Sequence, residues 1–511
     1  MSCTKHISFS QTELDRIKSY LGKYLRDPAI PTPAAVLDLA VARRNCERML
    51  DACKNLDIGL RGEVKSHKSS SLASLQCGEA GPLRFTFSTF PVAQELGSII
   101  RTAIANGRDV DVMYGLPVGQ CDIKRLAPMA SWAHQAWKSK PGKAGPPAIS
   151  VLIDDPDQLQ HVQSFKDLSE GLLPNVHIKL NVDSDGAGSL HDSDRFKQLA
   201  DAALEAQTRG EIVLAGLYAH TSDAMYKAKG SREENLCEAM YLLAKQFSFL
   251  QMAADAIVRS AETKAVTPIH TPLVLSASVR CAEVLEALHD YGKHGKDNNS
   301  LLENEAANLL YKLKTIRDSG FMTPEIHSGS HAMLDLQQLA VSQGLSTWTP
   351  NLWGNLALTV LAEVKPMQPG QEKYDDFPEV LINAGALALG EERCEKYPGL
   401  GMVTPWGRES SGNAQRPDSE RKQDMKMKDH EGWIVGKVNQ EHGVLKWQSG
   451  EKKSGSYNQE PDQLKMGQRV RIWPNSSSIT SNHFDFYLVI DSDRKGKEDQ
   501  IIEIWGCGRG C

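Results

Sequence analysis

The segment LRGEVKSHKSS, residues 60–70, places two lysines and a histidine within four residues of one another. Lys65 follows Val64, and His67 and Lys68 come soon after it. In a polar site that is partly shielded from water, the ammonium form of a lysine is disfavoured, and the neutral amine can condense with a carbonyl group. This chemistry points to an aldehyde cofactor, pyridoxal phosphate. The alternative interpretation is a solvated pair of lysines at the end of a strand.

A catalytic Lys65 needs a scaffold that holds it at the end of a strand. Between residues 32 and 345, short strand-like runs alternate with amphipathic helical stretches, and the eight strand candidates are AAVLDL, FTFSTF, DVDVMYG, AISVLID, VHIKLNV, IVLAGLYAH, TPLVLSAS and TPEIHSG. This alternation predicts an α/β fold, a TIM-like (β/α)8 barrel, in which the carboxyl ends of the strands carry the chemistry. Lys65 lies where the second barrel strand is expected, after a helix that ends near Leu56.

The pattern changes beyond the barrel. Residues 346–511 are rich in β-strand signals separated by glycine, proline and charged turns, which predicts a C-terminal β domain. Within it, a densely charged stretch near 405–430 predicts a disordered insertion. Residues 1–31 contain a helical pattern and are expected to form a helical lead-in to the cofactor-binding barrel over residues 32–345.

Composition excludes several classes of function. The chain has 511 residues, of which 41% are hydrophobic and 24% charged, and its net charge of −6 offers no basic face for nucleic acid. No apolar run is long enough to span a membrane, and the first residues lack the pattern of a secretory signal. Ten cysteines form no CxxC pair. We therefore expect a cytoplasmic protein with reduced thiols and neither membrane nor nucleic-acid partners.

Eight blocks in a fixed order carry a resemblance to a known family. They are TPAAVLDLAVARRNCERML, RGEVKSHKS, DVMYGLPV, VLIDDPDQL, GLYAH, EIHSGSHAMLDLQQ, INAGALALG and QEHG. In this order they resemble the eukaryotic D-serine dehydratase and D-threonine aldolase family, part of the alanine-racemase-like (fold type III) class of pyridoxal phosphate enzymes. The resemblance implies a barrel followed by a β domain, a homodimer, and a lyase that acts on a small D-amino acid with a β-hydroxyl group.

The resemblance also implies roles for single residues. Lys65 falls on the block VKSHK, whose first lysine holds the cofactor covalently and, once released, acts as a base near the substrate α-carbon. His67, in the same block, is expected to be an orienting or packing residue, and it is also a candidate to activate the substrate. Tyr218 matches a tyrosine that lies at the cofactor, although a half-buried barrel tyrosine is the alternative. Tyr226 resembles a second family tyrosine, one residue farther along.

Two turns are expected to bind the cofactor phosphate. Gly329 and Ser330 stand where the family has Gly-Asn, in a turn whose backbone amides can approach a phosphate closely. In SASVRCA, residues 276–282, Ser278 occupies a glycine position and Arg280 a threonine position. An arginine can bind phosphate with two hydrogen bonds, so Arg280 is either a replacement donor or a surface residue.

The largest departure from the family concerns a metal. The family binds a divalent cation, zinc in the dehydratases, through a His and a Cys or Asp spaced two apart. Here the segment is WPNSSSIT, with Ser476 and Ser478 at the ligand positions. Because a serine hydroxyl is a poor zinc ligand, we expect neither of these residues to bind zinc.

Three functions remain open on these residues. One is a lyase, dehydratase or retro-aldolase, that activates the β-hydroxyl by hydrogen bonds from groups such as His67, Ser476 or Ser478. Another is a metal-free amino-acid racemase or carbon–carbon bond-forming enzyme, for which the loss of a hydroxyl-binding metal is no handicap. The third is a non-catalytic descendant that binds the cofactor or a partner.

Overall fold

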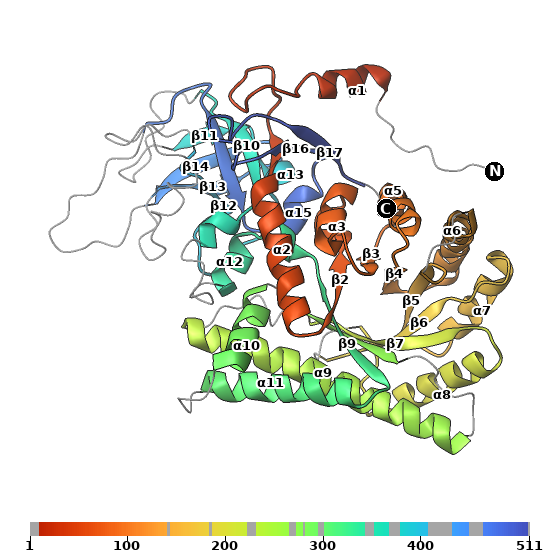
Figure 1. The fold of residues 1–511 in the computed structure, drawn as a ribbon. Helices are drawn as coiled ribbons and strands as arrows, with labels where there is room; N and C mark the ends of the chain where they lie inside the picture. Colours follow the sequence, from red (N-terminus) through yellow and green to blue (C-terminus); the bar gives the residue numbers. More distant parts are fainter. Residues whose placement is uncertain are drawn as a thin grey trace. The chain divides into compact units, whose positions relative to one another are not determined.

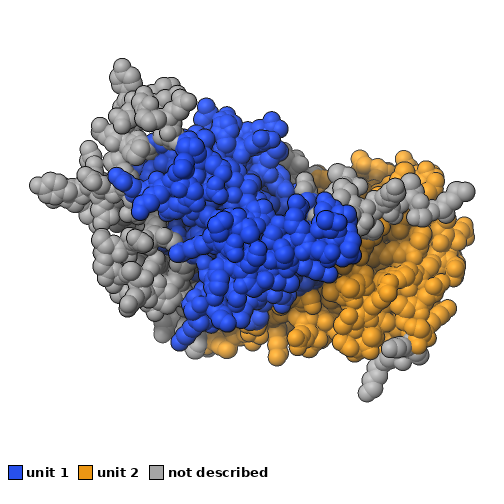
Figure 2. Space-filling model, turned by 90° about the horizontal axis from the view of Figure 1, so that it is seen from above, with its two compact units in different colours: residues 1–45, 66–72, 332–511 blue, residues 46–65, 73–331 orange. Residues whose placement is uncertain are grey.

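The computed structural model describes residues 10–139, 144–182, 187–221, 231–264, 272–279, 282–294, 301–342, 352–366, 379–406, 432–448 and 463–508. These residues belong to two compact units (Figure 2). Unit 1 comprises residues 1–45, 66–72 and 332–511, and unit 2 comprises residues 46–65 and 73–331. Two expected site residues, Tyr226 and Arg280, lie outside the described residues, as does nearly all of the expected insertion near 405–430.

Unit 2 contains a closed barrel of eight parallel strands, which confirms the predicted fold class. In order around the ring they are β2 (Gly59–Glu63), β3 (Leu83–Phe87), β4 (Val110–Pro117), β5 (Ala148–Ile153), β6 (Asn175–Leu180), β7 (Val213–Ala219), β8 (Leu273–Ser278) and β9 (Met322–Ser328). The ring closes where β9 pairs with β2. All eight carboxyl ends therefore lie at one end of the barrel.

Strand β1 (Ala34–Asp38) is not a barrel strand, so the assignment of AAVLDL to the barrel is wrong. β1 pairs with β10 (Leu358–Glu363) and β16 (Phe486–Ile490) in the sheet of unit 1. All five of its residues are buried, a pattern that suits a barrel and an open sheet equally. The first barrel strand is instead β2, whose glycines and charged residues give a weak strand signal. The domain limits inferred from the sequence stay a prediction.

Helices follow most of the barrel strands (Figure 1). Between β1 and β9 in the chain, the described α-helices are α2 (Leu39–Asn55), α3 (Ser70–Cys77), α4 (Phe90–Glu95), α5 (Gly97–Ala105), α6 (Gln120–Ser139), α7 (Gln158–Leu168), α8 (Asp194–Thr208), α9 (Arg232–Lys264), α10 (Ala282–His294) and α11 (Leu301–Asp318). The long helices α9 and α11 lie side by side. Among the described residues, none of the helices has both the length and the apolar character needed to cross a membrane.

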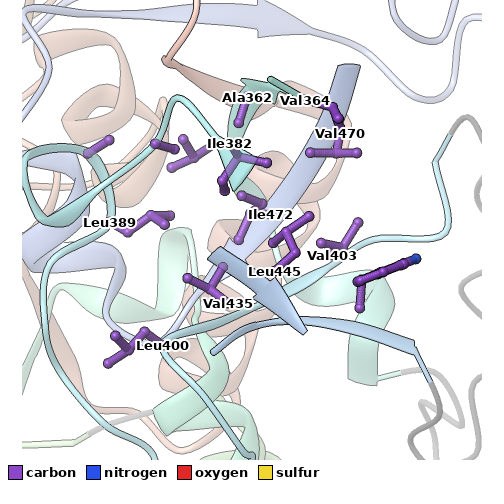
Figure 3. Close-up of a cluster of buried hydrophobic side chains, with 14 residues drawn as sticks. Ala362, Val364, Ile382, Leu389, Leu400, Val403, Val435, Leu445, Val470 and Ile472 are labelled. Atoms are coloured by element: carbon purple, nitrogen blue, oxygen red, sulfur yellow. The ribbon is translucent and has the colours of Figure 1, made fainter. Parts of the chain in front are cut away.

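Unit 1 is built on a nine-stranded, mostly antiparallel sheet, in agreement with the predicted β domain. Its order is β11 (Val380–Ile382), β14 (Gly443–Gln448), β13 (Gly432–Val438), β12 (Gly401–Val403), β15 (Arg469–Pro474), β10, β1, β16 and β17 (Glu503–Gly506). Its helices are α1 (Gln11–Lys18), α12 (Leu336–Ser342), α13 (Ala386–Leu389) and α15 (Ser477–Ser481), with a short 3-10 helix η4 (Leu352–Asn355). Branched side chains such as Val435, Leu445 and Ile472 converge in one core (Figure 3).

The interior of the barrel in unit 2 contains a charged layer rather than a purely apolar one. Arg61 on β2 donates from Nε to Oε1 of Glu325 on β9 at 2.8 Å, and from Nη2 to Oδ2 of Asp111 on β4 at 2.6 Å. Ser150 on β5 donates to the other oxygen of Asp111 at 2.6 Å. Burial raises the pKa of both carboxyl groups, but Arg61 outweighs it and holds each pKa below its ordinary value. The layer is thus a network of two buried ions, Arg61 and Glu325, and the half-buried Asp111, and it ties three strands together.

His177 on β6 is buried near this layer, and its two ring nitrogens have no hydrogen-bond partner among the described residues. Burial, followed by the charge of Arg61, lowers the pKa of His177 from 6.5 to about 4. At a pH between these two pKa values, the histidine binds a proton in the unfolded chain but stays neutral in the folded chain. We therefore expect the free energy of unfolding to fall as the pH decreases through this window, and His177→Leu to reduce that slope by up to about 1.4 kcal/mol per pH unit.

Urea unfolding of both chains across this pH window measures the slope. His161→Gln, at a half-buried histidine on α7, is the control and should keep the wild-type slope. An unchanged slope in His177→Leu would contradict the assignment.

Candidate active site

Lys65 lies in a short 3-10 turn, η1 (Val64–Ser66), that follows β2 directly. Its side chain is 48% exposed, and Nζ lies 3.4 Å from Oε2 of Glu63. Glu63 is the last residue of β2 and is buried. The amine therefore stands at the carboxyl end of a barrel strand, where the sequence led us to expect it, with a buried carboxylate beside it.

Strands β7 and β9 bring a tyrosine and two histidines to the same end of the barrel. The hydroxyl of Tyr218 donates to Oε1 of Glu63 at 3.0 Å, and its ring stacks on that of His327 with centroids 4.2 Å apart. Nε2 of His327 lies 3.2 Å from Nδ1 of His220. A Cβ at Gly216, earlier on β7, would lie 2.2 Å from a backbone oxygen of β8, so only glycine permits this close pairing of the two strands.

The charges of this cluster follow from burial and from one another. Burial raises the pKa of Glu63, but the neighbouring charges, that of Lys65 first, and the hydrogen bond from Tyr218 lower it more, and the carboxyl group ends well below its ordinary pKa. Burial lowers the pKa of His327 well below its ordinary value. Burial, with Glu63 next, raises the pKa of Tyr218 well above 10. At neutral pH, Glu63 is therefore ionised, His327 is neutral and Tyr218 keeps its proton.

A chain of hydrogen bonds sets the tautomer of His327. Glu325 is ionised by its pairing with Arg61, so it can only accept hydrogen bonds. The Ser276 hydroxyl, 2.9 Å from Oε1 of Glu325, must then donate its single proton there. It follows that the Ser276 oxygen accepts from Nδ1–H of His327, 3.0 Å away. Nε2 of His327 consequently carries a lone pair, and this lone pair faces Nδ1 of His220.

The residues expected to bind phosphate follow β8 and β9. Ser278 is buried; its Oγ donates to Oε1 of Gln246 at 3.0 Å and accepts from the backbone N–H of Thr221 at 3.1 Å. Gly329 is buried, and its carbonyl oxygen accepts from Gln76 at 2.8 Å. Ser330 is half-buried and begins the 3-10 turn η3 (Ser330–Ala332). A phosphate-binding role for Ser278, Gly329 and Ser330 stays a prediction.

The remaining expected residues belong to unit 1. His67 is buried, and its Nδ1 accepts from the backbone N–H of Ser69 at 3.1 Å. Ser476 precedes α15 and Ser478 lies within it. Within the described ranges, His, Cys, Asp and Glu side chains lie close enough to hold a metal ion in one group: the buried Glu63 and His327 and the half-buried His220. The catalytic role of His67 also stays a prediction.

Sequence reasoning did not select Glu63, and it gave His220 and His327 no chemical role. A signal was present where three strands end: a polar residue stands two positions from another polar residue, as in Glu63 and Lys65, Tyr218 and His220, and Glu325 and His327. Side chains two apart on a strand share a face. The pattern predicts a polar face on each strand but not that the three faces meet.

Comparisons with known proteins agree with this geometry. A family model described as a putative serine dehydratase domain matches residues 357–490. A D-serine dehydratase from Schizosaccharomyces pombe is 26% identical over 96% of this chain and 93% of its own length. One from Saccharomyces cerevisiae is 25% identical over 96% and 98%. Among solved structures, D-threo-3-hydroxyaspartate dehydratase from Delftia sp. HT23 has a TM-score of 0.62 at 21% identity, covering 96% of this chain and 100% of that one.

The closed parallel barrel and the separate sheet define an alanine-racemase-like fold. A solved alanine-racemase-like protein from Idiomarina loihiensis shares this fold at a TM-score of 0.61 and 17% identity, covering 96% of this chain and 100% of that one. Over nearly its whole length the chain is similar to D-serine dehydratases, and residues 357–490 match the putative serine dehydratase domain. The resemblance found in the sequence is thereby confirmed.

Proposed function

We propose that this chain is a pyridoxal-phosphate-dependent lyase that removes the β-hydroxyl group of, or cleaves, a small D-β-hydroxy amino acid. The observation that carries the proposal is the half-exposed amine of Lys65 at the carboxyl end of a barrel strand, beside the buried charge of Glu63. The names of the relatives support the substrate class, since serine and 3-hydroxyaspartate both carry a β-hydroxyl group.

The donor set fits the cofactor. Lys65 supplies the amine that an aldehyde requires, and Ser278, at the end of β8, with Gly329 and Ser330, after β9, are candidates to hold its phosphate. Tyr218 and His327 offer a stacked aromatic pair and polar edges beside the amine. When bound, pyridoxal phosphate supplies an electron sink that makes bonds to the substrate α-carbon easier to break.

The residues of the chain supply positioning and proton transfer. With the cofactor bound, Nζ of Lys65 would be placed to accept the proton of the substrate α-carbon. Glu63 stabilises positive charge on Nζ, because its carboxylate is ionised and buried 3.4 Å away. Tyr218 holds Glu63 in place through its hydroxyl. The neutral His327 adds no positive charge that would compete with Lys65 for this carboxylate.

Product analysis separates the three functions left open by the sequence. We expect D-serine to yield pyruvate and ammonia, or D-threonine to yield acetaldehyde and glycine, with the L-amino acids turned over far more slowly. A change of optical configuration without these products would identify a racemase. No turnover of any of the four amino acids, by a chain that still binds the cofactor, would favour the non-catalytic alternative.

We further propose a homodimer, by resemblance to the family, and a cytoplasmic location, from the sequence. Serine hydroxyls are poor zinc ligands, so the proposal includes no zinc at Ser476 or Ser478. Sedimentation of the purified chain and cell fractionation test the assembly and the location.

A further inference from the structure

The three ligand-type side chains at the end of the barrel lie unusually close together. The donor atoms of Glu63, His220 and His327 are all within 4.8 Å of one another. Nδ1 of His220 and Nε2 of His327 are 3.2 Å apart. Two imidazole nitrogens bound to one tetrahedral zinc-type cation, at about 2.0–2.1 Å each, are separated by about 3.3 Å. The spacing of the two nitrogens is therefore that of two ligands of a single ion.

We infer that Glu63, His220 and His327 bind a divalent, zinc-type cation at the carboxyl ends of β2, β7 and β9. Two imidazoles and a carboxylate are a ligand set that zinc and its first-row neighbours favour. Three protein ligands leave a coordination position open for water or a substrate oxygen. The inference shares Glu63 and His327 with the proposed function, but it concerns binding of the metal alone and is tested without turnover.

The groups behind the ligands are arranged as they are behind metal ligands elsewhere. His327 donates its Nδ1–H to Ser276, which in turn donates to Glu325, so Nε2 is left with a lone pair directed at His220. Oε1 of Glu63 accepts from the hydroxyl of Tyr218. Such outer hydrogen bonds orient a ligand and fix its tautomer. These hydrogen bonds therefore orient His327 and Glu63 without a bound ion.

A hydrogen bond from Nδ1–H of His220 to His327 would also account for the 3.2 Å spacing. It would not account for the third donor, a buried carboxylate oxygen that lies within 4.8 Å of the donor atoms of both rings. His220 is half-buried, which gives an ion a path to the site. In the chain as described, Lys65 lies 3.4 Å from Oε2 of Glu63, so its ammonium group opposes a cation there.

Cobalt(II) is the probe, because its visible absorption reports coordination by nitrogen and oxygen. We expect the full-length chain, dialysed against a chelator, to bind one Co²⁺ per chain with the intense bands of four- or five-coordination, and Zn²⁺ to displace it. His220→Gln and Glu63→Gln should each weaken binding by at least about tenfold. Lys65→Met should strengthen it several-fold, since a neighbouring positive charge is removed.

Two controls locate the ion. His161→Gln removes a half-buried histidine elsewhere on the barrel unit and should bind Co²⁺ as the wild type does. The double variant Ser476→Ala, Ser478→Ala should also bind normally; a loss there would move the ion to those positions and overturn the inference. Absence of saturable binding in the wild type, or wild-type affinity in His220→Gln, would overturn it as well.

If Glu63→Gln does not fold, His220→Gln decides the outcome. No measurement requires turnover, so failure of the lyase proposal leaves this test intact.

Discussion

Replacing Lys65 with alanine is expected to lower kcat with a D-β-hydroxy amino acid by at least about 10³-fold and to abolish covalent binding of the cofactor. Two losses combine in this variant. The aldehyde loses the amine with which it condenses, and the substrate α-carbon loses the base that takes up its proton. Glu63, ionised and buried beside Lys65, cannot take over, because a carboxylate forms no carbon–nitrogen bond.

Borohydride reduction followed by mass spectrometry of the peptide that contains residue 65 measures the covalent bond directly. Wild-type protein should carry a reduced cofactor adduct on Lys65, and the variant should carry none. Lys54→Ala, at an exposed lysine on α2, is the matched control and should keep both the adduct and the activity. An adduct on another lysine of the wild type would show that the cofactor is held elsewhere.

Replacing Arg61 with alanine is expected to lower the free energy of unfolding by about 3–5 kcal/mol. Arg61 is almost fully buried, and its removal leaves the carboxylates of Glu325 and Asp111 without their main counter-charge. The deficit should shrink at low pH. The pKa values of both carboxyl groups are lowered in the folded chain, so the stability that this pairing contributes is present above their ordinary pKa values and is lost as the pH falls below them.

Urea unfolding at neutral and at acidic pH measures both effects. Arg44→Ala, which breaks an exposed ion pair with Asp493, is the control and should cost less than about 1 kcal/mol. A cost for Arg61→Ala as small as that of Arg44→Ala would mean that the charged layer does not hold the barrel together.

The alternation of strand-like and helical patterns predicted the barrel, and the block VKSHK selected the lysine that the structure places at a strand end. Both are local signals, since periodicity and a short motif are properties of neighbouring residues. The assignment of AAVLDL to the barrel was wrong for the same reason. A buried strand followed by a helix has the same local pattern whichever sheet it joins, and β1 is assigned to its sheet only by its partners β10 and β16.

The candidate site shows the same division between local and non-local information. By itself the sequence predicted the barrel class and the resemblance to D-serine dehydratases, and it selected Lys65 as the candidate amine. Only the tertiary structure decided that Glu63, His220 and His327 meet, and that Ser276 and Glu325 fix the proton on His327. These residues come from strands far apart in the chain. Their contacts exist because the barrel closes and its parallel register brings the carboxyl ends of the strands together, and no pattern within a short segment records that closure.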